Sequence, residues 1–505
     1  MEYDPKQGIR DHEKTVLPDL KAKLSAYVDA FNAADEELYT ELIPNRDAFA
    51  YLADQIPLLE CPDKTIEQTY YFRWWTLRKH WKDTPDGHIL TEFLPPVGWA
   101  GPYNSINCPV GHHIRESRWL RDPEGWVREN IRFWMDKKGR TLAYSAWYAS
   151  VIEDMLNLHP DPAYEAYCLD RLIALYGERE EISLHPCGLF WSEDGWDGGE
   201  LSISGSGLRP TMNAYMCGDA MAISRMAARQ GHFAESAEFA RKAERIREKM
   251  DALLWDGDFY KVLPCGRNDE IPDKRPPVPP ENDVREELGF IPWYFGIPGP
   301  DKSAAFRQLT EEEGFAAPYG IATAERRHPR FMFKHPHECL WNGPVWPFAT
   351  SQTLTALARH LREHGEAGIT KNDYVRLLVQ YAASHRLVGE DGREQMWIDE
   401  DMDPFTGEWI ARRELKADNW NPGRGGVERG KDYNHSTFCD LVLSGLLGID
   451  ARDGRLTVDP LIPDDWDWFC VTNLPPRGET VIFDRTGERY GLGAGLHVLE
   501  KRPNL

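Results

Sequence analysis

The residues best suited to chemistry begin with a short acidic segment, SEDGWDGGELSISGSGLRP, from Ser192 to Pro210. It combines Asp194, Asp197 and Glu200 with Trp196 in a stretch rich in glycine and serine. Glycine lets the backbone approach a ligand closely, and a neighbouring indole lowers the local polarity, which raises a carboxyl pKa toward the range of a general acid. Asp197 is therefore a candidate acid. The alternative is that Asp197 or Asp194 only stabilises a turn.

A second acidic segment, MWIDEDMDPFTGEWI from Met396 to Ile410, places four carboxylates before a Pro-x-Thr-Gly turn. Crowded carboxylates can act as acid and base groups, bind a cation or simply face solvent. The glycine and glutamate that an EF-hand loop requires at its sixth and twelfth positions are missing, so a metal site is the weaker interpretation. The four carboxylates, flanked by Trp397 and Phe405, are Asp399, Glu400, Asp401 and Asp403.

An aromatic segment, HPHECLWNGPVWPFATSQ, begins at His335. Its Asn-Gly-Pro triplet, Asn342 to Pro344 with Gly343 at the centre, predicts a turn. Trp341 and Trp346 on either side offer planes on which a sugar ring can stack, because a pyranose has an apolar face and a rim of hydroxyls. This combination suits a cleft that holds something polar against an apolar wall.

Several histidines raise the question of zinc. His335, His337 and Cys339 lie close together in the sequence, but a second tight pair such as Cys-x-x-Cys is missing. His112 and His113, in GHHIRE, lack the His-Glu-x-x-His order of a helical zinc site. Structural histidines are favoured in both places. No cofactor is predicted, although the acidic loops would suit a structural calcium ion.

The segment KDYNHSTFCDL leads into the last predicted helix, from about Ser436 to Gly448. Asn434 or Ser436 would cap that helix, and His435 would lie at its positive end, where an uncharged polar ligand could bind. No G-x-S-x-G elbow, G-x-G-x-x-G fingerprint or Walker loop occurs, so a serine-hydrolase triad and a nucleotide cofactor are not expected.

Composition restricts the class of protein. The 505 residues carry 59 basic and 82 acidic side chains, a formal charge of −23, which argues against binding nucleic acid or an anionic membrane. Nine widely spaced cysteines without a Cys-x-x-Cys pair indicate reduced thiols. No signal-peptide core and no membrane-spanning apolar run are found, so a cytoplasmic protein is expected. A homo-oligomer is left open.

Helical periodicity dominates the elements that must position these segments. One helix is predicted from Thr15 to Ile43, and a pair of helices between Thr211 and Leu254 is interrupted at Arg229–His232. A second pair follows, from Ser351 to Gly365 and from Asn372 to Gly389. Short turns between helices predict antiparallel hairpins. The fold class is therefore mainly α, a toroid of helical hairpins, with a bundle-type repeat array as the alternative; no fixed-period repeat is found.

Long segments rich in Gly, Pro and Trp separate the helices, and loops of this length inside a compact domain are usually functional. After Gly448 the pattern changes to short alternating runs between turn residues, which predicts a small antiparallel sheet packed on the helical body. The predicted division is residues 1–448 as a catalytic domain with long active-site loops and 449–505 as a β appendage.

Four motifs, EDGWDGGE, HECLWNGPVWP, MWIDEDMDPFTGE and YNHSTFCDLVLSGLLGI, resemble those of six-hairpin (α/α)6-barrel glycosidases. The similarity is to relatives of glycoside hydrolase family 63 and the trehalases, especially the mannosylglycerate hydrolase-like branch, and extends from about Tyr71 to Gly448. The resemblance implies an inverting enzyme acting on an α-linked glucoside or mannoside. It places the acid at Asp197 and the base at Glu400, with Asp399 or Asp401 as alternatives for the base.

The chemistry of inversion independently favours such a pair, because a protonated carboxyl and an ionised one must lie on opposite faces of the sugar with room for water. Asp197 and Glu400 come from distant loops and can meet this need, whereas Asp194 and Asp197 are too close in sequence. The GPVWP stretch, from Gly343, is implied by the resemblance to line the sugar pocket. The substrate-binding candidates are Arg73, Trp74, Trp99, Tyr103, Trp196, Arg209, Trp341, Asn342, Gly343, Trp346 and His435.

The expected function is exo-acting hydrolysis of a small α-linked glycoside: a disaccharide, an oligosaccharide end or a glycosylglycerate. The expected partner is a small carbohydrate. One alternative is an epimerase or lyase on the same toroid, with His435, His113 or Tyr433 as the base; another is a sugar-binding protein without activity. The glycine-rich loop from Arg412 to Lys431 is a candidate lid.

Overall fold

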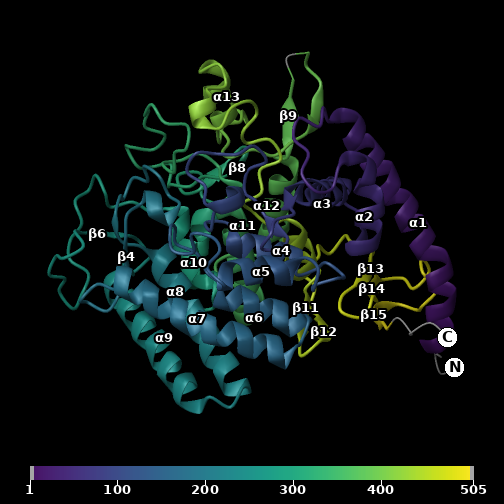
Figure 1. Cartoon of the computed structure of the whole chain (residues 1–505), viewed down its shortest axis with the longest axis horizontal. Coiled ribbons are helices and arrows are strands. Elements are labelled where there is room, and N and C mark those ends of the chain that lie inside the picture. The colour runs from purple at the N-terminus through teal and green to yellow at the C-terminus, as the bar shows by residue number, and fades with distance from the viewer. Residues whose placement is uncertain (1–4, 390, 501–505) are drawn as a thin grey trace.

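The computed structural model describes residues 5–389 and 391–500, with side chains from residue 20 onward, as a largely helical body with small sheets around it (Figure 1). The mainly α class is confirmed. The helices are α1 (Pro5–Ala34), α2 (Ala48–Gln55), α3 (Lys64–Leu77), α4 (Val110–Ser117), α5 (Val127–Met135), α6 (Ala149–Leu158), α7 (Pro162–Ser183), α8 (Pro210–Arg229), α9 (Phe233–Leu253), α10 (Ile291–Tyr294), α11 (Pro347–His364), α12 (Lys371–Ala383) and α13 (Ile410–Ala417).

The two expected helical pairs both form. Helices α8 and α9 run side by side as an antiparallel hairpin, which turns at Gly231, where φ is +80°. Proline at the first position of α8 and α11 suits a helix start, because its missing N–H would have no partner there. Thr370 and Asp373 form a capping box at the start of α12. These local signals explain why the hairpins could be predicted.

Two helices end earlier than expected. Helix α1 ends at Ala34 rather than Ile43, because Asp35 turns into the protein and binds Lys79 at 2.9 Å, and Lys431 as well. Glu37 then adopts φ of +46°, which no helix can include. Helix α12 ends at Ala383 because the chain that follows forms a two-stranded hairpin, β9 (Arg386–Val388) with β10 (Glu394–Met396).

The last helix begins later than predicted and is short. Helical geometry starts at Cys439, and residues Leu441–Leu446 form a π-helix, η8. Neither Asn434 nor Ser436 caps it. The cap is Glu116 of α4, whose carboxylate accepts hydrogen bonds from the N–H groups of Phe438, Cys439 and Asp440.

The preceding segment stays extended because tertiary contacts hold it. Arg73 donates to the backbone oxygen and the hydroxyl of Ser436, at 2.8 and 3.0 Å, and Asn434 donates to Thr91 at 3.1 Å. These bonds keep residues 433–438 out of the helix, so that Tyr433 and His435 lie beside the cavity described below.

The C-terminal strands form two antiparallel units. Strands β11 (Ile449–Arg452) and β12 (Arg455–Val458) make a hairpin, and β13 (Trp468–Leu474), β14 (Glu479–Asp484) and β15 (Gly495–Leu499) belong to a four-stranded sheet in the order β1-β13-β14-β15. The fourth strand, β1 (Leu58–Glu60), comes from the N-terminal part of the chain and pairs with β13. The sheet therefore joins distant parts of the sequence, and the division at residue 448 stays a prediction.

Short strands also support the long loops: β2 (Trp81–Lys82) with β3 (Ile89–Leu90), β4 (Trp191–Ser192) with β5 (Gly207–Leu208) and β6 (Leu263–Pro264), and β7 (Ala316–Ala317) with β8 (Gly320–Ile321). Pairing of β4 with β5 closes the acidic segment 192–208 into a loop with fixed ends. The residues between β4 and β5 form the loop that extends from this strand pair.

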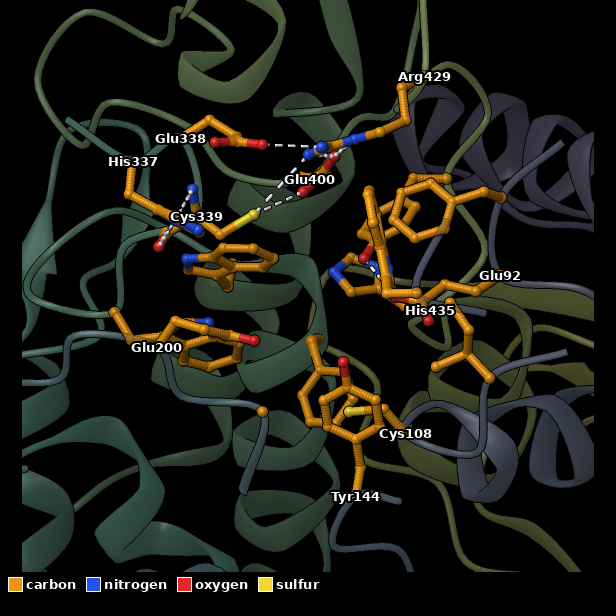
Figure 2. Close-up of a pocket in the computed structure, with 18 residues that line it drawn as sticks. Glu92, Cys108, Tyr144, Glu200, His337, Glu338, Cys339, Glu400, Arg429 and His435 are labelled. Carbon is orange, nitrogen blue, oxygen red and sulfur yellow. Dashed lines mark hydrogen bonds and ion pairs between the residues drawn. The ribbon is translucent and has the colours of Figure 1, made fainter. Parts of the chain in front are cut away.

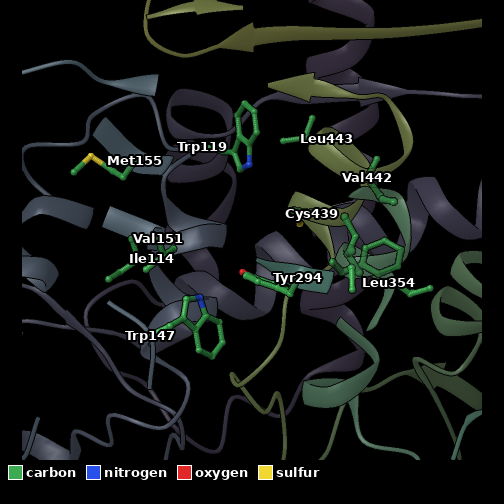
Figure 3. Close-up of a cluster of buried hydrophobic side chains, with 14 of the residues drawn as sticks. Ile114, Trp119, Trp147, Val151, Met155, Tyr294, Leu354, Cys439, Val442 and Leu443 are labelled. Atoms are coloured by element: carbon green, nitrogen blue, oxygen red, sulfur yellow. The ribbon is translucent and has the colours of Figure 1, made fainter. Parts of the chain in front are cut away.

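The core lies where several helices converge (Figure 3). Ile114 of α4, Val151 and Met155 of α6, Leu354 of α11 and Val442 of η8 are buried together there. None of the nine cysteines, all of which lie in the described residues, forms a disulfide bond. Within residues 5–389 and 391–500, no helix is long and apolar enough to cross a membrane.

Candidate active site

One cavity of about 240 Å³ collects side chains from six separate parts of the chain (Figure 2). They come from the loop after β3, the loop before α6, the acidic loop between β4 and β5, the aromatic segment before α11, and the loops before and after α13. The lining residues are Glu92, Phe93, Trp99, Ile106, Cys108, Tyr144, Gly198, Glu200, His337, Glu338, Cys339, Trp341, Trp346, Phe348, Glu400, Arg429, Tyr433 and His435.

Glu400 lies on this cavity and is held by Arg429. The Arg429 Nε donates to Glu400 Oε1 at 2.7 Å, and its Nη1 donates to Glu338 at 2.8 Å. The Cys339 thiol donates to Glu400 Oε2 at 3.0 Å. Burial opposes the charge on Arg429, but the Glu400 carboxylate outweighs it and raises the Arg429 pKa. These contacts fix the direction in which the Glu400 carboxylate faces the cavity.

The other three acids of the same segment accept hydrogen bonds from backbone N–H groups and do not line the cavity. Asp399 accepts from the Glu400 N–H at 2.9 Å, Asp401 accepts from the Ala411 N–H at 3.0 Å, and Asp403 accepts from two N–H groups of the following turn. Burial, reinforced by Glu400, raises the Asp399 pKa to about 7. None of the three lines the cavity. Geometry therefore favours Glu400 over Asp399 and Asp401 as the base.

Glu200 brings a second carboxyl group to the cavity, below Glu400 in the view of Figure 2. Burial raises its pKa to about 7, and the charges of Glu400 and Asp194 act in the same direction. At neutral pH a large share of Glu200 is therefore protonated. Glu200 and Glu400 thus bring two carboxyl groups to the same cavity, and acid and base catalysis requires such a pair.

Asp197 takes a different position. Its side chain is 0% exposed, and its Oδ2 accepts from the Arg209 Nε at 2.7 Å. Arg209 is itself fully buried and also donates to Ser202 Oγ at 3.1 Å and to the Gly205 carbonyl. Burial raises the Asp197 pKa, whereas Arg209 lowers it. The neighbouring Gly198 lines the cavity, but Asp197 does not.

Glu92 adds a third carboxyl group, which the sequence analysis did not single out. It accepts a hydrogen bond from the Tyr433 hydroxyl. Burial raises the Glu92 pKa to about 8, with Glu400 and Glu200 acting in the same direction. His435 lies against Tyr433, with ring centroids 3.7 Å apart, and burial holds its pKa well below the usual range, so the ring is neutral.

Aromatic rings form the apolar part of the lining. Trp341 stacks on Trp346, with centroids 4.6 Å apart and an angle of 14° between the planes. Trp346 is fixed by its indole N–H, which donates to the Leu340 carbonyl at 2.8 Å. Trp99 lies 5.4 Å from the Arg429 guanidinium. A sugar ring can place its apolar face on such indoles while its hydroxyls meet the carboxyl groups.

Five of the residues chosen from the sequence meet at the cavity: Trp99, Trp341, Trp346, Glu400 and His435. Three others do not line the cavity but bind neighbouring residues. Arg73 anchors Ser436, Arg209 binds Asp197, and Asn342 is fully buried, donating to the Phe333 carbonyl at 2.8 Å. The remaining four lie elsewhere: Trp74 in the core, Gly343 in the turn before Val345, and Tyr103 and Trp196 on the surface.

The histidine groups that raised the question of zinc have other partners. His337 lines the cavity, and its Nδ1 lies 2.9 Å from the Cys339 carbonyl oxygen. His113 lies 2.6 Å from the Asn434 carbonyl, and His112 packs against Trp147. Within the described parts of the chain, no group of three or more His, Cys, Asp or Glu side chains is arranged to hold a metal ion.

The residues that the sequence analysis missed are Glu92, Glu338 and Arg429, and it gave Glu200 no role. Glu200 lies three positions after Asp197 in the segment already suspected, so only the direction of its side chain was unknown. Arg429 follows a run of glycines in the loop considered as a lid, and no pattern marked it. The long-range pairing of Arg429 with Glu400 has no signal in the sequence.

A cavity lined by several carboxyl groups and indoles is the kind of site that a glycosidase uses. Consistent with this class, residues 102–436 match the model of a mannosylglycerate hydrolase MGH1-like glycoside hydrolase domain. The chain belongs to this family of glycoside hydrolases, and the expected resemblance to the mannosylglycerate hydrolase-like branch is confirmed.

Solved structures agree. A protein named "Sialidase" is 35% identical over 95% of this chain, with a TM-score of 0.85, and this chain spans 43% of that protein's length. The mannosylglycerate hydrolase of family 63 from Thermus thermophilus, in complex with glucose, is 14% identical over 74% of this chain and 98% of its own, with a TM-score of 0.52. At that identity the likeness concerns the fold.

Proposed function

We propose that this protein is an exo-acting, inverting hydrolase of α-linked glycosides, built on an (α/α)6 toroid of helical hairpins. The observation that carries the proposal is the pair of carboxyl groups on one cavity, Glu400 bound to a cation and Glu200 with a raised pKa. A binding protein needs no such pair.

In this mechanism Glu400 is the base. Its carboxylate removes a proton from a water molecule whose oxygen attacks the anomeric carbon from the face opposite the leaving group. A carboxyl group of the acidic loop, Asp197 or Glu200, gives its proton to the glycosidic oxygen as the C–O bond breaks. The product sugar leaves with inverted configuration, and both carboxyl groups return to their starting states by exchange with solvent.

A cavity of only about 240 Å³ favours cleavage of a terminal sugar over attack within a polymer. The proposed substrate is a disaccharide, an oligosaccharide end or a glycosylglycerate with a neutral terminal sugar. Among the described residues that line the cavity, Arg429 is the only arginine or lysine, and it already pairs with Glu400 and Glu338. A terminal sialoside is the second candidate, because the relative that is 35% identical is named a sialidase.

The test is proton NMR of purified protein with α- and β-linked glycosides of neutral sugars, glycosylglycerates and α-sialosides. We expect one α-glycoside to be cleaved and to release the β-anomer first. Release of the α-anomer first would contradict inversion. An isomerised sugar without a new reducing end would instead support an epimerase, with neutral His435 or Tyr433 at the cavity as its base. No turnover of any glycoside by folded protein would contradict the hydrolase and favour a binding role.

A further inference from the structure

The two oxygens of the Glu400 carboxylate have different partners in the cavity. We propose that Oε2 is the oxygen that takes the proton from the attacking water, and that Cys339 is a positioning residue whose thiol holds this oxygen in place. The proposal rests on the hydrolase function proposed above. It names the reacting atom of the base and its support, whichever carboxyl group of the acidic loop is the acid.

Oε1 of Glu400 is occupied by the guanidinium of Arg429. The Arg429 Nε donates to this oxygen at 2.7 Å, and Nη2 of the same guanidinium donates to it as well. A carboxylate has about two lone-pair positions on each oxygen, so these two N–H donors fill the positions of Oε1. Charge-assisted hydrogen bonds of this kind are also the strong ones. Oε1 is therefore not free to take up a proton from water.

Oε2 has a single partner among the described residues, the Cys339 thiol, at 3.0 Å. A thiol is a weak donor, so it directs the oxygen and leaves a lone pair for a proton. The Cys339 sulfur also lies 3.7 Å from Arg429 Nη2, which closes a ring of contacts between Glu400, Arg429 and Cys339 (Figure 2). Because a guanidinium has only donors, the sulfur accepts from Arg429 and its S–H is left for Oε2.

Cys339 keeps the proton that this contact requires. Burial raises the pKa of the Cys339 thiol well above its usual value, and the Glu400 carboxylate acts in the same direction, whereas Arg429 lowers it. The thiol is therefore protonated at neutral pH and remains a donor. A buried thiol in this state is a poor nucleophile, so the contact with Glu400 orients the base and does not introduce a second reactive group.

The chain on both sides of Cys339 is fixed at the cavity. The preceding residue, Glu338, accepts from Arg429 Nη1 at 2.8 Å. The following residue, Leu340, accepts at its carbonyl from the Trp346 indole N–H at 2.8 Å. The thiol therefore has a defined place relative to the arginine that holds the other oxygen of the base.

In the proposed step an O–H bond of water breaks and its proton moves to Glu400 Oε2, while the water oxygen forms a bond to the anomeric carbon. The bond from that carbon to the glycosidic oxygen breaks, and a carboxyl group of the acidic loop gives its proton to that oxygen. The products are the sugar hemiacetal and the free aglycone alcohol. Both carboxyl groups return to their starting states by exchange with solvent, and no oxidant or cofactor is required.

The experiment is a double-mutant cycle of Cys339→Ala and Glu400→Gln, measured on the glycosyl fluoride of the sugar that the NMR panel identifies. Fluoride departs with little help from an acid, so the rate reports on the activation of water. We expect Cys339→Ala to lower kcat about five- to tenfold with little change in KM, the effect of one lost hydrogen bond. In the Glu400→Gln background the same substitution should change kcat less than about twofold, because the oxygen that Cys339 positions no longer takes up a proton. Cys339→Ser keeps a donor and should stay within about threefold of the wild type.

Cys108→Ala is the matched control, because Cys108 lines the same cavity but is not among the donors to Glu400. Any loss that it causes should be the same in both backgrounds. Equal losses from Cys339→Ala in both backgrounds, or a Cys339→Ser variant as slow as Cys339→Ala, would overturn the proposal. If Cys339→Ala does not fold, Cys339→Val, which also lacks a donor, completes the cycle. Wild-type protein inactive on every glycoside would instead overturn the hydrolase itself.

Discussion

The guanidinium of Arg429 bridges two carboxylates of the cavity, Glu400 at 2.7 Å and Glu338 at 2.8 Å. Arg429 and Glu400 are both 1% exposed in their side chains. A pair so well buried is strengthened by the low polarity around it, and it orients the Glu400 carboxylate. We therefore regard Arg429 as a positioning residue for the base Glu400, because it orients the carboxylate without touching the reacting atoms.

Replacing Arg429 is expected to lower the rate of the reaction. In Arg429→Met the Glu400 carboxylate loses the guanidinium that orients it toward the cavity. We expect kcat to fall at least about 100-fold, consistent with a loss of about 3 kcal/mol. Measuring kcat and KM of the variant and the wild type checks this.

The matched control is Arg424→Met. Arg424 binds Glu338, with its Nε 3.4 Å from Oε1, but makes no contact with Glu400. We expect a smaller loss of kcat. An equal loss in both variants would mean that Arg429 does not act through its contact with Glu400.

Much of the fold could be predicted because local signals agreed with it. The α8–α9 hairpin carries its helix periodicity, a proline start and a glycine turn within a short stretch of sequence. The last helix could not be placed correctly, since its cap is Glu116 of α4, far away in the sequence. For the same reason β1 was missed: three residues form a strand only because β13 lies beside them.

In the site, too, the features with local sequence signals could be predicted, and those set by long-range contacts could not. The residue types at Glu400, Trp341 and Trp346 indicated a sugar cleft, and the structure places all three at one cavity. The choice between Asp197 and Glu200 could not be made, because it depends on which way each side chain leaves a tight loop. That direction is set by contacts across the fold, with Arg209 for Asp197 and with Trp341 for the Glu200 backbone.

Glu92 is expected to make stability depend on pH. Its pKa in the folded protein is raised to about 8, above its value in the unfolded chain, so the folded state favours the protonated form. The stabilisation is complete below the unfolded pKa and is lost as the pH rises through about 8. A pKa that is higher by one in the folded state stabilises the protonated protein by about 1.4 kcal/mol. The Tm of the wild type should therefore fall more between about pH 5 and about pH 9 than that of Glu92→Gln.

Thermal unfolding followed by circular dichroism at several pH values measures this difference. Glutamine keeps an oxygen that can accept from the Tyr433 hydroxyl, so the variant imitates the neutral acid. Identical pH dependence in both proteins would show that Glu92 does not carry the raised pKa.

Trp341 is expected to bind the terminal sugar. Its ring is stacked on Trp346 and forms part of the cavity lining. Trp341→Ala removes about 1–2 kcal/mol of ring contact, so KM should rise about tenfold, with a smaller change in kcat. Trp341→Phe keeps an aromatic face and is the control, with at most a small rise. An unchanged KM in Trp341→Ala would exclude stacking on this ring.

The loop from Arg412 to Lys431 is expected to be stabilised by a bound sugar. It carries Arg429 and Arg424, whose guanidinium groups bind Glu338 at the edge of the cavity, and its Arg412 forms an ion pair with Glu428. These tethers hold the loop across the site without burying it in the core, since residues 419–424 are mostly exposed. A ligand that fills the cavity would add contacts to Arg429 and reduce opening.

Limited digestion with trypsin and mass spectrometry of the fragments tests this expectation. Saturating product sugar should slow cleavage after Arg424 several-fold, because proteolysis of a folded protein follows the population of the opened loop. Cleavage after Arg267 and Lys274 in the exposed segment after β6 is the internal control and should be unaffected. Equal slowing at both places would point to general stabilisation by mass action. Unchanged cleavage after Arg424, with sugar binding verified by tryptophan fluorescence, would show that the loop is not a lid.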